Sequence, residues 1–151
     1  MASQDRSNQL DSRDSEAGGY RLVVGTPDIT SYMRLRSISG LSEKSLEAAA
    51  SGLPNTIHAV TVSWKGDSVG MGRVIGDGGC FYQITDIAVD PDHQGKGLGK
   101  RIMEALVSHL RATAPKTAYV SLIADGPARH LYEKYGFEPT APASIGMALQ
   151  L

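Results

Sequence analysis

The sequence predicts a mixed α/β (α+β) fold in which a central, mainly antiparallel β-sheet is flanked by about four helices. β-branched runs of strand length alternate with segments of helical period, which indicates neither a repeat protein nor a helical bundle. The runs from Thr56 to Trp64 and from Ser68 to Ile75 are joined by the turn Lys65-Gly-Asp67 and predict a hairpin. Leu98 to Ala112 has apolar residues at the spacing of one buried helix face.

The predicted elements follow the order β-α-α-β-β-β-α-β-α-β. Asp28 is placed to cap the first helix, which Gly40 stops, and Gly52 ends the second helix. We expect strands at residues 20–25, 56–64, 68–75, 81–89, 118–123 and 144–151, and helices at 28–38, 42–50, 98–112 and 127–135.

Residues 20–151 form one predicted domain, since no linker or internal repeat divides them. Residues 1–19 are too polar to repay the entropy of ordering, so we expect a disordered tail. That segment lacks the apolar stretch of a signal peptide, and no window holds the roughly 18 consecutive apolar residues of a membrane helix. The single Cys80 excludes an intramolecular disulfide. We therefore expect a cytoplasmic protein with no membrane partner.

Charge and histidine spacing narrow the classes of function. The 15 Lys and Arg residues nearly balance the 16 Asp and Glu residues, which leaves a formal net charge of −1. A chain without a basic field lacks the electrostatic footprint of a nucleic-acid-binding protein. The four histidines show no metal-ligand spacing, so we expect no metal site.

A glycine-rich turn, Asp90 to Lys100, lies between a predicted strand and the long predicted helix. Alternating glycines let a backbone approach a ligand closely, and a helix N-terminus offers free N–H groups and the positive end of its dipole to a phosphate. Lys96 and Lys100 add positive charge. Lys100 stands where a dinucleotide-binding loop needs glycine, and Asp90 and Gly97 break a Walker loop. A tight strand-to-helix turn without a ligand is the alternative interpretation.

Two motifs in the second half of the chain resemble those of one enzyme family. Gln94-Gly-Lys-Gly-Leu-Gly99 matches the Q/R-x-x-G-x-G/A signature of the GCN5-related N-acetyltransferases, the GNAT family. Leu131-Tyr-Glu-Lys-Tyr-Gly-Phe137 resembles the second motif of that family, and the element order from residue 20 to 151 agrees with it. The resemblance implies the GNAT fold and the transfer of an acetyl group from acetyl-CoA to an amine.

The same resemblance implies where acetyl-CoA binds. Its pyrophosphate is expected on the turn and helix start, and its pantetheine arm along Ile87 to Val89, where one backbone N–H polarises the thioester carbonyl. The residues implied in acetyl-CoA binding are Ile87, Ala88, Val89, Gln94, Gly95, Lys96, Gly97, Leu98, Gly99, Lys100, Asp125, Arg129 and Tyr132.

The catalytic residues implied by the resemblance are Tyr132, Asp86 and Asp125. Tyr132 occupies the family's acid position, and a phenol with a pKa of about 10 suits a departing thiolate; a core tyrosine is the alternative. The base is open between Asp86, Asp125 and water, because Gln83 stands where histone-type members carry a glutamate. Strict alternation puts Asp86 on the opposite strand face from Gln83 unless a bulge re-aims it. The structural alternatives are a bracing carboxylate for Asp86 and a helix cap for Asp125.

The expected acceptor is the primary amine of a small molecule: an arylalkylamine, a polyamine or an amino sugar. Asp86, Asp125 and the pair Gly146-Met147 resemble the plant-type arylalkylamine (serotonin) branch of the family. An amino-sugar phosphate requires a basic pocket, for which Arg73 and Arg34 are candidates. The residues expected to contact the amine are Gln83, Tyr82, Arg73 and Tyr32.

Two other functions stay open. A protein or peptide N-acetyltransferase is disfavoured because a nearly neutral chain has no acidic surface for basic tails. A non-catalytic acyl-CoA-binding domain is favoured by the missing glutamate at Gln83 and disfavoured by the presence of Tyr132. A homodimer through the C-terminal strand or helix is a further hypothesis that the resemblance supplies.

Overall fold

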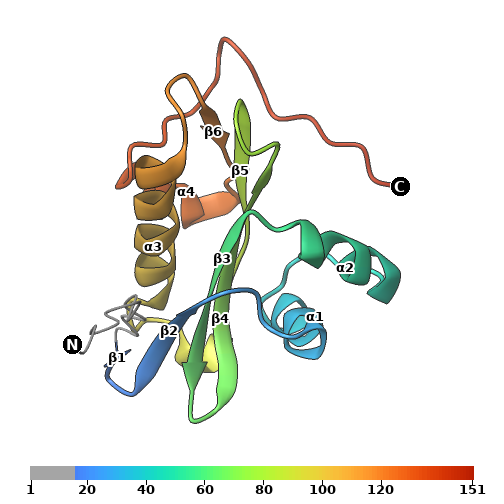
Figure 1. Cartoon of the computed structure of the whole chain (residues 1–151), viewed down its shortest axis with the longest axis vertical. Helices are drawn as coiled ribbons and strands as arrows, with labels where there is room; N and C mark the ends of the chain where they lie inside the picture. Colours follow the sequence, from blue (N-terminus) through green and yellow to red (C-terminus); the bar gives the residue numbers. More distant parts are fainter. Residues whose placement is uncertain (1–15) are drawn as a thin grey trace, which may run out of the picture.

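A computed structural model describes residues 16–151 and confirms the predicted mixed α/β class (Figure 1). One six-stranded sheet runs in chain order, with antiparallel neighbours except for the parallel pair of its last two strands. The strands are β1 (Glu16–Ala17), β2 (Tyr20–Val24), β3 (His58–Trp64), β4 (Asp67–Gly76), β5 (Phe81–Val89) and β6 (Tyr119–Ser121). The helices are α1 (Ile29–Ile38), α2 (Leu46–Gly52), α3 (Leu98–Thr113) and α4 (Arg129–Glu133), with short 3-10 turns at Leu53–Asn55, Pro91–His93 and Gly126–Ala128.

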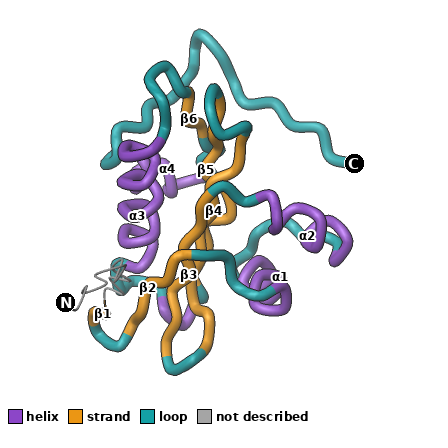
Figure 2. The backbone as a smooth tube through the Cα atoms, in the orientation of Figure 1, coloured by secondary structure: helices purple, strands orange, loops and turns teal. Residues whose placement is uncertain are grey.

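The helices cover the two faces of the sheet unequally. Figures 1 and 2 show α3 and α4 on one face and α1 and α2 on the other. The larger core lies under α3, where Ile102, Met103 and Leu106 are fully buried against β3, β4 and β5. Truncating one such side chain to alanine typically costs about 2–5 kcal/mol. A smaller core on the opposite face joins Tyr32 and Leu35 of α1 to the sheet.

A β-bulge interrupts β5 in the middle of the sheet. Met71 pairs with Ala88 and Arg73 pairs with Thr85, so Asp86 and Ile87 lie opposite the single residue Gly72. Asp86 adopts a left-handed φ of 57°, which few non-glycine residues do. A Cβ on Gly72 would lie 2.5 Å from Ile102 and 2.7 Å from Ile87, so the bulge needs a glycine at this position. The bulge therefore lets Ile87 reach the α3 core while the chain changes direction.

β5 and β6 separate soon after they meet. They pair only from Phe81 to Gln83, opposite Tyr119 to Ser121. Beyond Gln83, β5 has no strand on that side in residues 16–151. Ile87 to Val89 therefore lie on an open sheet edge.

Most predicted boundaries are confirmed, and three predictions are wrong or shifted. The second helix begins at Leu46, because Ser45 rather than Ser42 accepts a hydrogen bond from the backbone N–H of Ala48 (3.0 Å). The predicted helix 127–135 is shortened to α4 after a 3-10 turn. Residues 144–151 were expected to form a strand, yet they are extended without pairing within the described chain. Alternation alone does not make a strand when no neighbouring edge supplies hydrogen bonds.

The predicted tail falls mostly outside the described residues. Residues 1–15 are not among them. Glu16 pairs with Arg21 and Ala17 with Tyr20, so the sheet begins before residue 20, where we expected the domain to start.

Candidate active site

The site divides into two parts around the bulge of β5. The first part, which we call the donor side, comprises the end of β5, residues 94–100 with the start of α3, and the helix α4. We call α1, α2 and the parts of β4 and β5 that face them the acceptor side.

The glycine-rich turn of the donor side is open at its glycines. Gly95 and Gly97 have φ angles of 76° and 77°, and a Cβ added to either would meet nothing within 4 Å. The side-chain amide of Gln94 donates to the carbonyl oxygen of Val89 (3.0 Å) and fixes the turn to the strand. Its contact with the cofactor stays a prediction. The glycines allow both the left-handed backbone and the close approach of a ligand.

The start of α3 fits an anion. Gly97 is its N-cap, no side chain caps the helix, and no acidic residue lies in its first turn. The first N–H groups of such a helix point outward without an intrahelical acceptor and carry the positive end of the dipole. Lys96 and Lys100 are exposed beside them, whereas the Leu98 side chain is buried and contributes only its backbone. Gly99 lies 3.6 Å (measured from an added Cβ) from Leu131, which allows α4 to approach α3.

Tyr132 of α4 lies beside the segment that follows β6. It lines a cavity of about 310 Å³ with Leu122 to Ala124, the segment that follows β6, and with Arg129. Burial and then the nearby Asp125 carboxylate raise the pKa of Tyr132 above its ordinary value. The phenol therefore keeps its proton at neutral pH. Asp125 itself is exposed and does not cap the following turn, so its predicted capping alternative is not realised.

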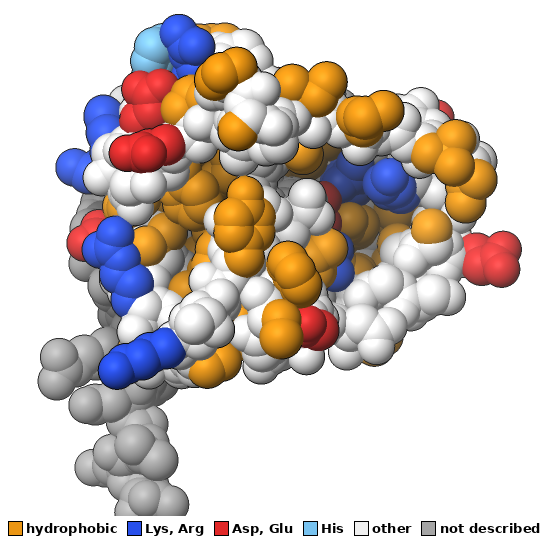
Figure 3. All heavy atoms as spheres, turned by 90° about the horizontal axis from the view of Figure 1, so that it is seen from above, with side chains coloured by type: hydrophobic (Ala, Val, Ile, Leu, Met, Phe, Trp, Pro, Cys, Tyr) orange, Lys and Arg blue, Asp and Glu red, His pale blue; other side chains and the backbone are white. Residues whose placement is uncertain are grey.

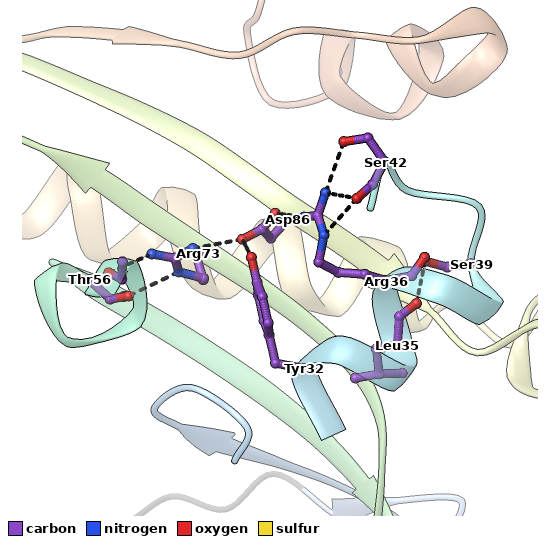
Figure 4. A network of polar contacts seen from close by, with 9 residues as sticks. Tyr32, Leu35, Arg36, Ser39, Ser42, Thr56, Arg73 and Asp86 are labelled. Atoms are coloured by element: carbon purple, nitrogen blue, oxygen red, sulfur yellow. Dashed lines mark hydrogen bonds and ion pairs between the residues drawn. The ribbon is translucent and has the colours of Figure 1, made fainter. Parts of the chain in front are cut away.

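Asp86 lies at the centre of a buried polar network on the acceptor side (Figure 4). Its Oδ2 accepts from the Tyr32 hydroxyl at 2.8 Å and from Nη1 of Arg73 at 2.7 Å, and its Oδ1 accepts from Nη1 of Arg36. The carboxylate is 7% exposed, and the two guanidinium groups are nearly as buried. Burial and the bond to Asp86 raise the pKa of Tyr32, so the phenol is held as a donor.

The outer ends of the network attach to loops. Nε of Arg73 donates to the Thr56 hydroxyl (2.9 Å), and Nη2 donates to the carbonyl of Gly52 (3.3 Å). Nε of Arg36 donates to the carbonyl of Ser42 (3.0 Å). Asp86 thereby ties α1, the loop after α1, the end of α2 and β4 to the bulge.

The bulge changes which β5 side chains share a face. Tyr82 and Ile84 lie in the α3 core, so Gln83 faces the acceptor side by alternation, as Asp86 does. The bulge is the exception that our alternation argument allowed: its extra residue resets the alternation, so Asp86 and Gln83 share a face. Tyr82, which we expected at the amine, is 6% exposed in the α3 core and is not brought to the acceptor side.

Arg73 and Tyr32, predicted to contact the amine, line a cavity of about 250 Å³ between α1, α2 and β4. Lys44, Ala48 and Leu53 complete much of its wall. Figure 3 shows a hollow on this side of the molecule, with Lys or Arg side chains inside it and hydrophobic side chains around it. Arg34, the other predicted basic candidate, contacts the Ser68 carbonyl and Asp90 instead.

Sequence reasoning missed Arg36 and Lys44. Leu35 and Arg36 follow Tyr32 by three and four residues, which puts both on the helix face of Tyr32, and this spacing was the available signal. Lys44 lies in the segment 42–45, which we predicted to be helical and which is a loop. No sequence pattern places that loop over the cavity.

Several other observations concern the chain outside these two parts. The rings of His58 and His109 stack with centroids 3.6 Å apart, and Cys80 is exposed. Within residues 16–151 no three His, Cys, Asp or Glu side chains gather as metal ligands would. None of the helices in that range is long and apolar enough to cross a membrane.

Comparison with known proteins gives a consistent assignment. The family model of the acetyltransferase (GNAT) domain matches residues 55–139, more than half of the 151 residues. A solved structure from methicillin-resistant Staphylococcus aureus, of unknown function and named a probable acetyltransferase, is 45% identical with a TM-score of 0.84, covering 87% of this chain and 99% of that one.

Two curated plant proteins are also similar over part of the chain. GCN5-related N-acetyltransferase 2, chloroplastic, of Arabidopsis thaliana is 37% identical over 79 residues, which are 52% of this chain and 30% of that protein. Serotonin N-acetyltransferase 2, chloroplastic, of Oryza sativa subsp. japonica is 35% identical over 86 residues, which are 57% of this chain and 42% of that protein. The chain thus spans less than half the length of both. On the family model, the solved structure and the site geometry together, this chain belongs to the GNAT acetyltransferase family.

Proposed function

We propose that this chain is an N-acetyltransferase that moves the acetyl group of acetyl-CoA to the primary amine of a small molecule bound in the same complex. One observation carries the proposal: Tyr132, a phenol that keeps its proton, lines a cavity together with the residues that follow β6. Such a proton donor, in a chain that also has an open edge on β5 and a turn suited to an anion, supports acyl transfer from a thioester.

The residues that fit acetyl-CoA are those of the donor side. Gly95, Gly97 and the first N–H groups of α3 are suited to the pyrophosphate, with Lys96 and Lys100 beside them. The unpaired edge of Ile87 to Val89 is suited to the amides of the pantetheine arm. When bound, acetyl-CoA supplies an activated acetyl thioester. Arg129 lines the same cavity as Tyr132, and the Asp125 carboxylate is close enough to raise the pKa of Tyr132.

The proton balance assigns different roles to the predicted catalytic residues. The amine must lose a proton to react, and the departing thiolate must gain one. We assign proton donation to Tyr132. Asp86 already accepts from three side chains and holds the acceptor side in place, so we assign it a positioning role. We assign removal of the amine proton to Asp125 or to water. Asp125→Asn separates the two when the pH profile of kcat/KM is compared: if Asp125 is the base, the acid limb of the profile is lost, whereas an effect through Tyr132 or through CoA binding leaves that limb in place.

The acceptor cavity supports a small molecule rather than a polypeptide. It measures about 250 Å³ and is walled by the α1–α2 pair. The name of the rice relative includes serotonin, which agrees with a small amine as the class of acceptor. A protein substrate and a non-catalytic acyl-CoA-binding domain are the alternatives that the experiment must distinguish.

The test is release of free CoA thiol from acetyl-CoA in the presence of a panel of amines and of short peptides. We expect release above background with at least one small amine. Thiol release with peptides alone would favour the protein acetyltransferase, and binding of CoA with no release would favour the non-catalytic domain.

Tyr132→Phe sharpens the test. Loss of a general acid is expected to lower kcat by about 100-fold or more, with CoA affinity unchanged. An equal loss of CoA affinity and turnover would make Tyr132 structural instead. Tyr135→Phe is the matched control, since it removes a hydroxyl just beyond α4 that donates to the carbonyl of Lys100 (2.9 Å) and does not face the Tyr132 cavity. We expect it to leave the proton-donation step unchanged.

We also propose a homodimer that uses residues 144–151. In Figure 1 this segment leaves the body of the molecule and ends on the side of α2. Ile145, Met147 and Leu149 alternate along it and are 72%, 89% and 85% exposed. β6 is the last strand of the described sheet, so its outer edge suits a strand from a second copy. Light scattering should show a dimer that Met147→Asp with Leu149→Asp converts to a monomer; a monomeric parent protein would contradict this.

The compartment stays a prediction. We propose the cytoplasm, although the names of both plant relatives place those proteins in the chloroplast. Microscopy of a tagged full-length chain tests this.

A further inference from the structure

The charges around the acceptor cavity do not balance. Arg36 and Arg73 are 5% and 7% exposed, and Asp86 is the carboxylate that pairs with both of them. Two guanidinium groups against one carboxylate leave one net positive charge in a buried cluster. Lys44 adds another at the cavity wall, and no acidic residue lines this cavity. A buried charge without a counter-charge is costly, so the arrangement favours an anion.

Arg73 retains donors for such an anion. A guanidinium carries five N–H groups, and the hydrogen bonds of Arg73 use three of them, toward Thr56, Asp86 and Gly52. The planar fork of arginine matches a carboxylate or a phosphate. Arg73 lines the cavity, as Lys44 does, so both cations border the space that an acceptor would occupy.

Nearby acids do not cancel the excess. Glu43 lines the adjoining surface depression with Arg36 and Lys44, but it is exposed and makes no ion pair within 4 Å among the described residues. The Tyr32 phenol contributes no charge, because its pKa is raised and it donates to Asp86.

We propose that the acceptor is an amine that also carries an anionic group, a carboxylate or a phosphate, and that Arg73 and Lys44 select it. This rests on the proposed N-acetyltransferase function and narrows its acceptor. A purely cationic amine, such as a polyamine or an arylalkylamine, brings a second positive charge to a site that already has an excess. An amino acid or an amino-sugar phosphate brings the missing counter-charge beside its amine.

The experiment compares amines in matched pairs that differ in the anionic group. The pairs are tryptamine with tryptophan, putrescine with ornithine, and glucosamine with glucosamine 6-phosphate. We expect kcat/KM to be at least about tenfold higher for the anionic member of one or more pairs, the size of one charge-assisted hydrogen bond. The first two pairs report a carboxylate and the third a phosphate. A preference for the non-anionic member in all three pairs would overturn the inference and leave the acetyltransferase function standing.

A variant pair tests the residues. Arg73 is buried and its substitution can fail to fold, so the exposed Lys44 carries the test. Lys44→Gln should reduce the preference for the anionic amine at least about threefold through a higher KM, whereas Lys116→Gln, which is equally exposed in the turn after α3, should not. If both variants behave alike, Lys44 does not select the acceptor.

A binding measurement keeps the inference independent of turnover. If no amine releases thiol, the proposed function fails, and calorimetry of the same pairs with the CoA-saturated protein still decides the acceptor question. Tighter binding of an anionic member supports the anion site. Equal or weaker binding of every anionic member overturns it.

Discussion

The donor side and the acceptor side of β5 are built from different parts of the polypeptide. The donor side uses backbone: glycines with positive φ, a helix N-terminus without a side-chain cap, and the open edge of Ile87 to Val89. The acceptor side uses side chains from separate elements, Tyr32, Arg36 and Arg73, which meet on Asp86. Substitutions on the acceptor side can therefore change which amine binds, while the backbone features of the donor side stay the same.

The largest expected effect is on the acceptor side. Asp86→Asn leaves two buried guanidinium groups without their carboxylate, and breaking a buried ion pair in this way costs about 3–5 kcal/mol. Urea unfolding measures this loss. Asp67→Asn, at the exposed first residue of β4, is the matched control and should change the free energy of unfolding by less than about 0.5 kcal/mol. A loss below about 1 kcal/mol for Asp86→Asn would mean that the network is not a structural centre.

The second largest loss of stability is expected at Gly72, which lies opposite the bulge between the two sides. Gly72→Ala puts a Cβ within 3 Å of Ile102, Ile87 and Leu106, and overpacking of a core typically costs about 1–3 kcal/mol. Gly52→Ala, where an added Cβ meets nothing within 4 Å, should be neutral or stabilising. Comparable losses of stability in the two variants would contradict the tight packing of the bulge.

On the donor side, we expect Gly97→Ala to weaken CoA binding more than backbone strain alone would. Gly97 and Gly78 have φ angles of 77° and 79°, and neither has an atom within 4 Å of an added Cβ. Alanine at either position should cost about 1–2 kcal/mol of backbone strain. Only Gly97→Ala should weaken CoA, by about tenfold, because only that Cβ stands at the anion-binding turn. Equal CoA affinities in the two variants would remove Gly97 from the donor site.

The smallest expected effect lies outside both sides, at the stacked rings of His58 and His109. Burial and then the charge of His109 lower the pKa of His58. The unfolded chain therefore binds this proton more readily than the folded protein, so this contribution to stability is present above a pH of about 6.5 and is lost as the pH falls further. His109→Gln should flatten the pH dependence of the free energy of unfolding in this range. An unchanged slope would mean that the charge of His109 does not contribute and that burial alone lowers the pKa of His58.

The two sides also differ in how far the sequence could predict them. The glycine turn, the long helix and Tyr132 lie in contiguous motifs, so local patterns sufficed. The network around Asp86 joins residues up to 54 positions apart, and a one-residue bulge decides which face Asp86 occupies. Periodicity carries no signal for that bulge, so alternation alone could not decide whether Asp86 shares a face with Gln83. The prediction of a strand at residues 144–151 was wrong for a related reason. A strand forms only where a neighbouring strand edge can pair with it, and an alternating pattern of apolar residues does not specify that edge.

The most direct test of the division between the two sides is the CoA affinity of two charge variants, measured by calorimetry without an acceptor. Lys96→Gln with Lys100→Gln removes two exposed cations beside the start of α3, and Lys44→Gln removes one from the acceptor cavity. We predict that the double variant binds CoA at least about tenfold more weakly, from the loss of two charge-assisted contacts, and that Lys44→Gln binds CoA as the parent does. CoA binding that is unchanged in the double variant, or weakened as much by Lys44→Gln, would contradict the assignment of donor and acceptor sides.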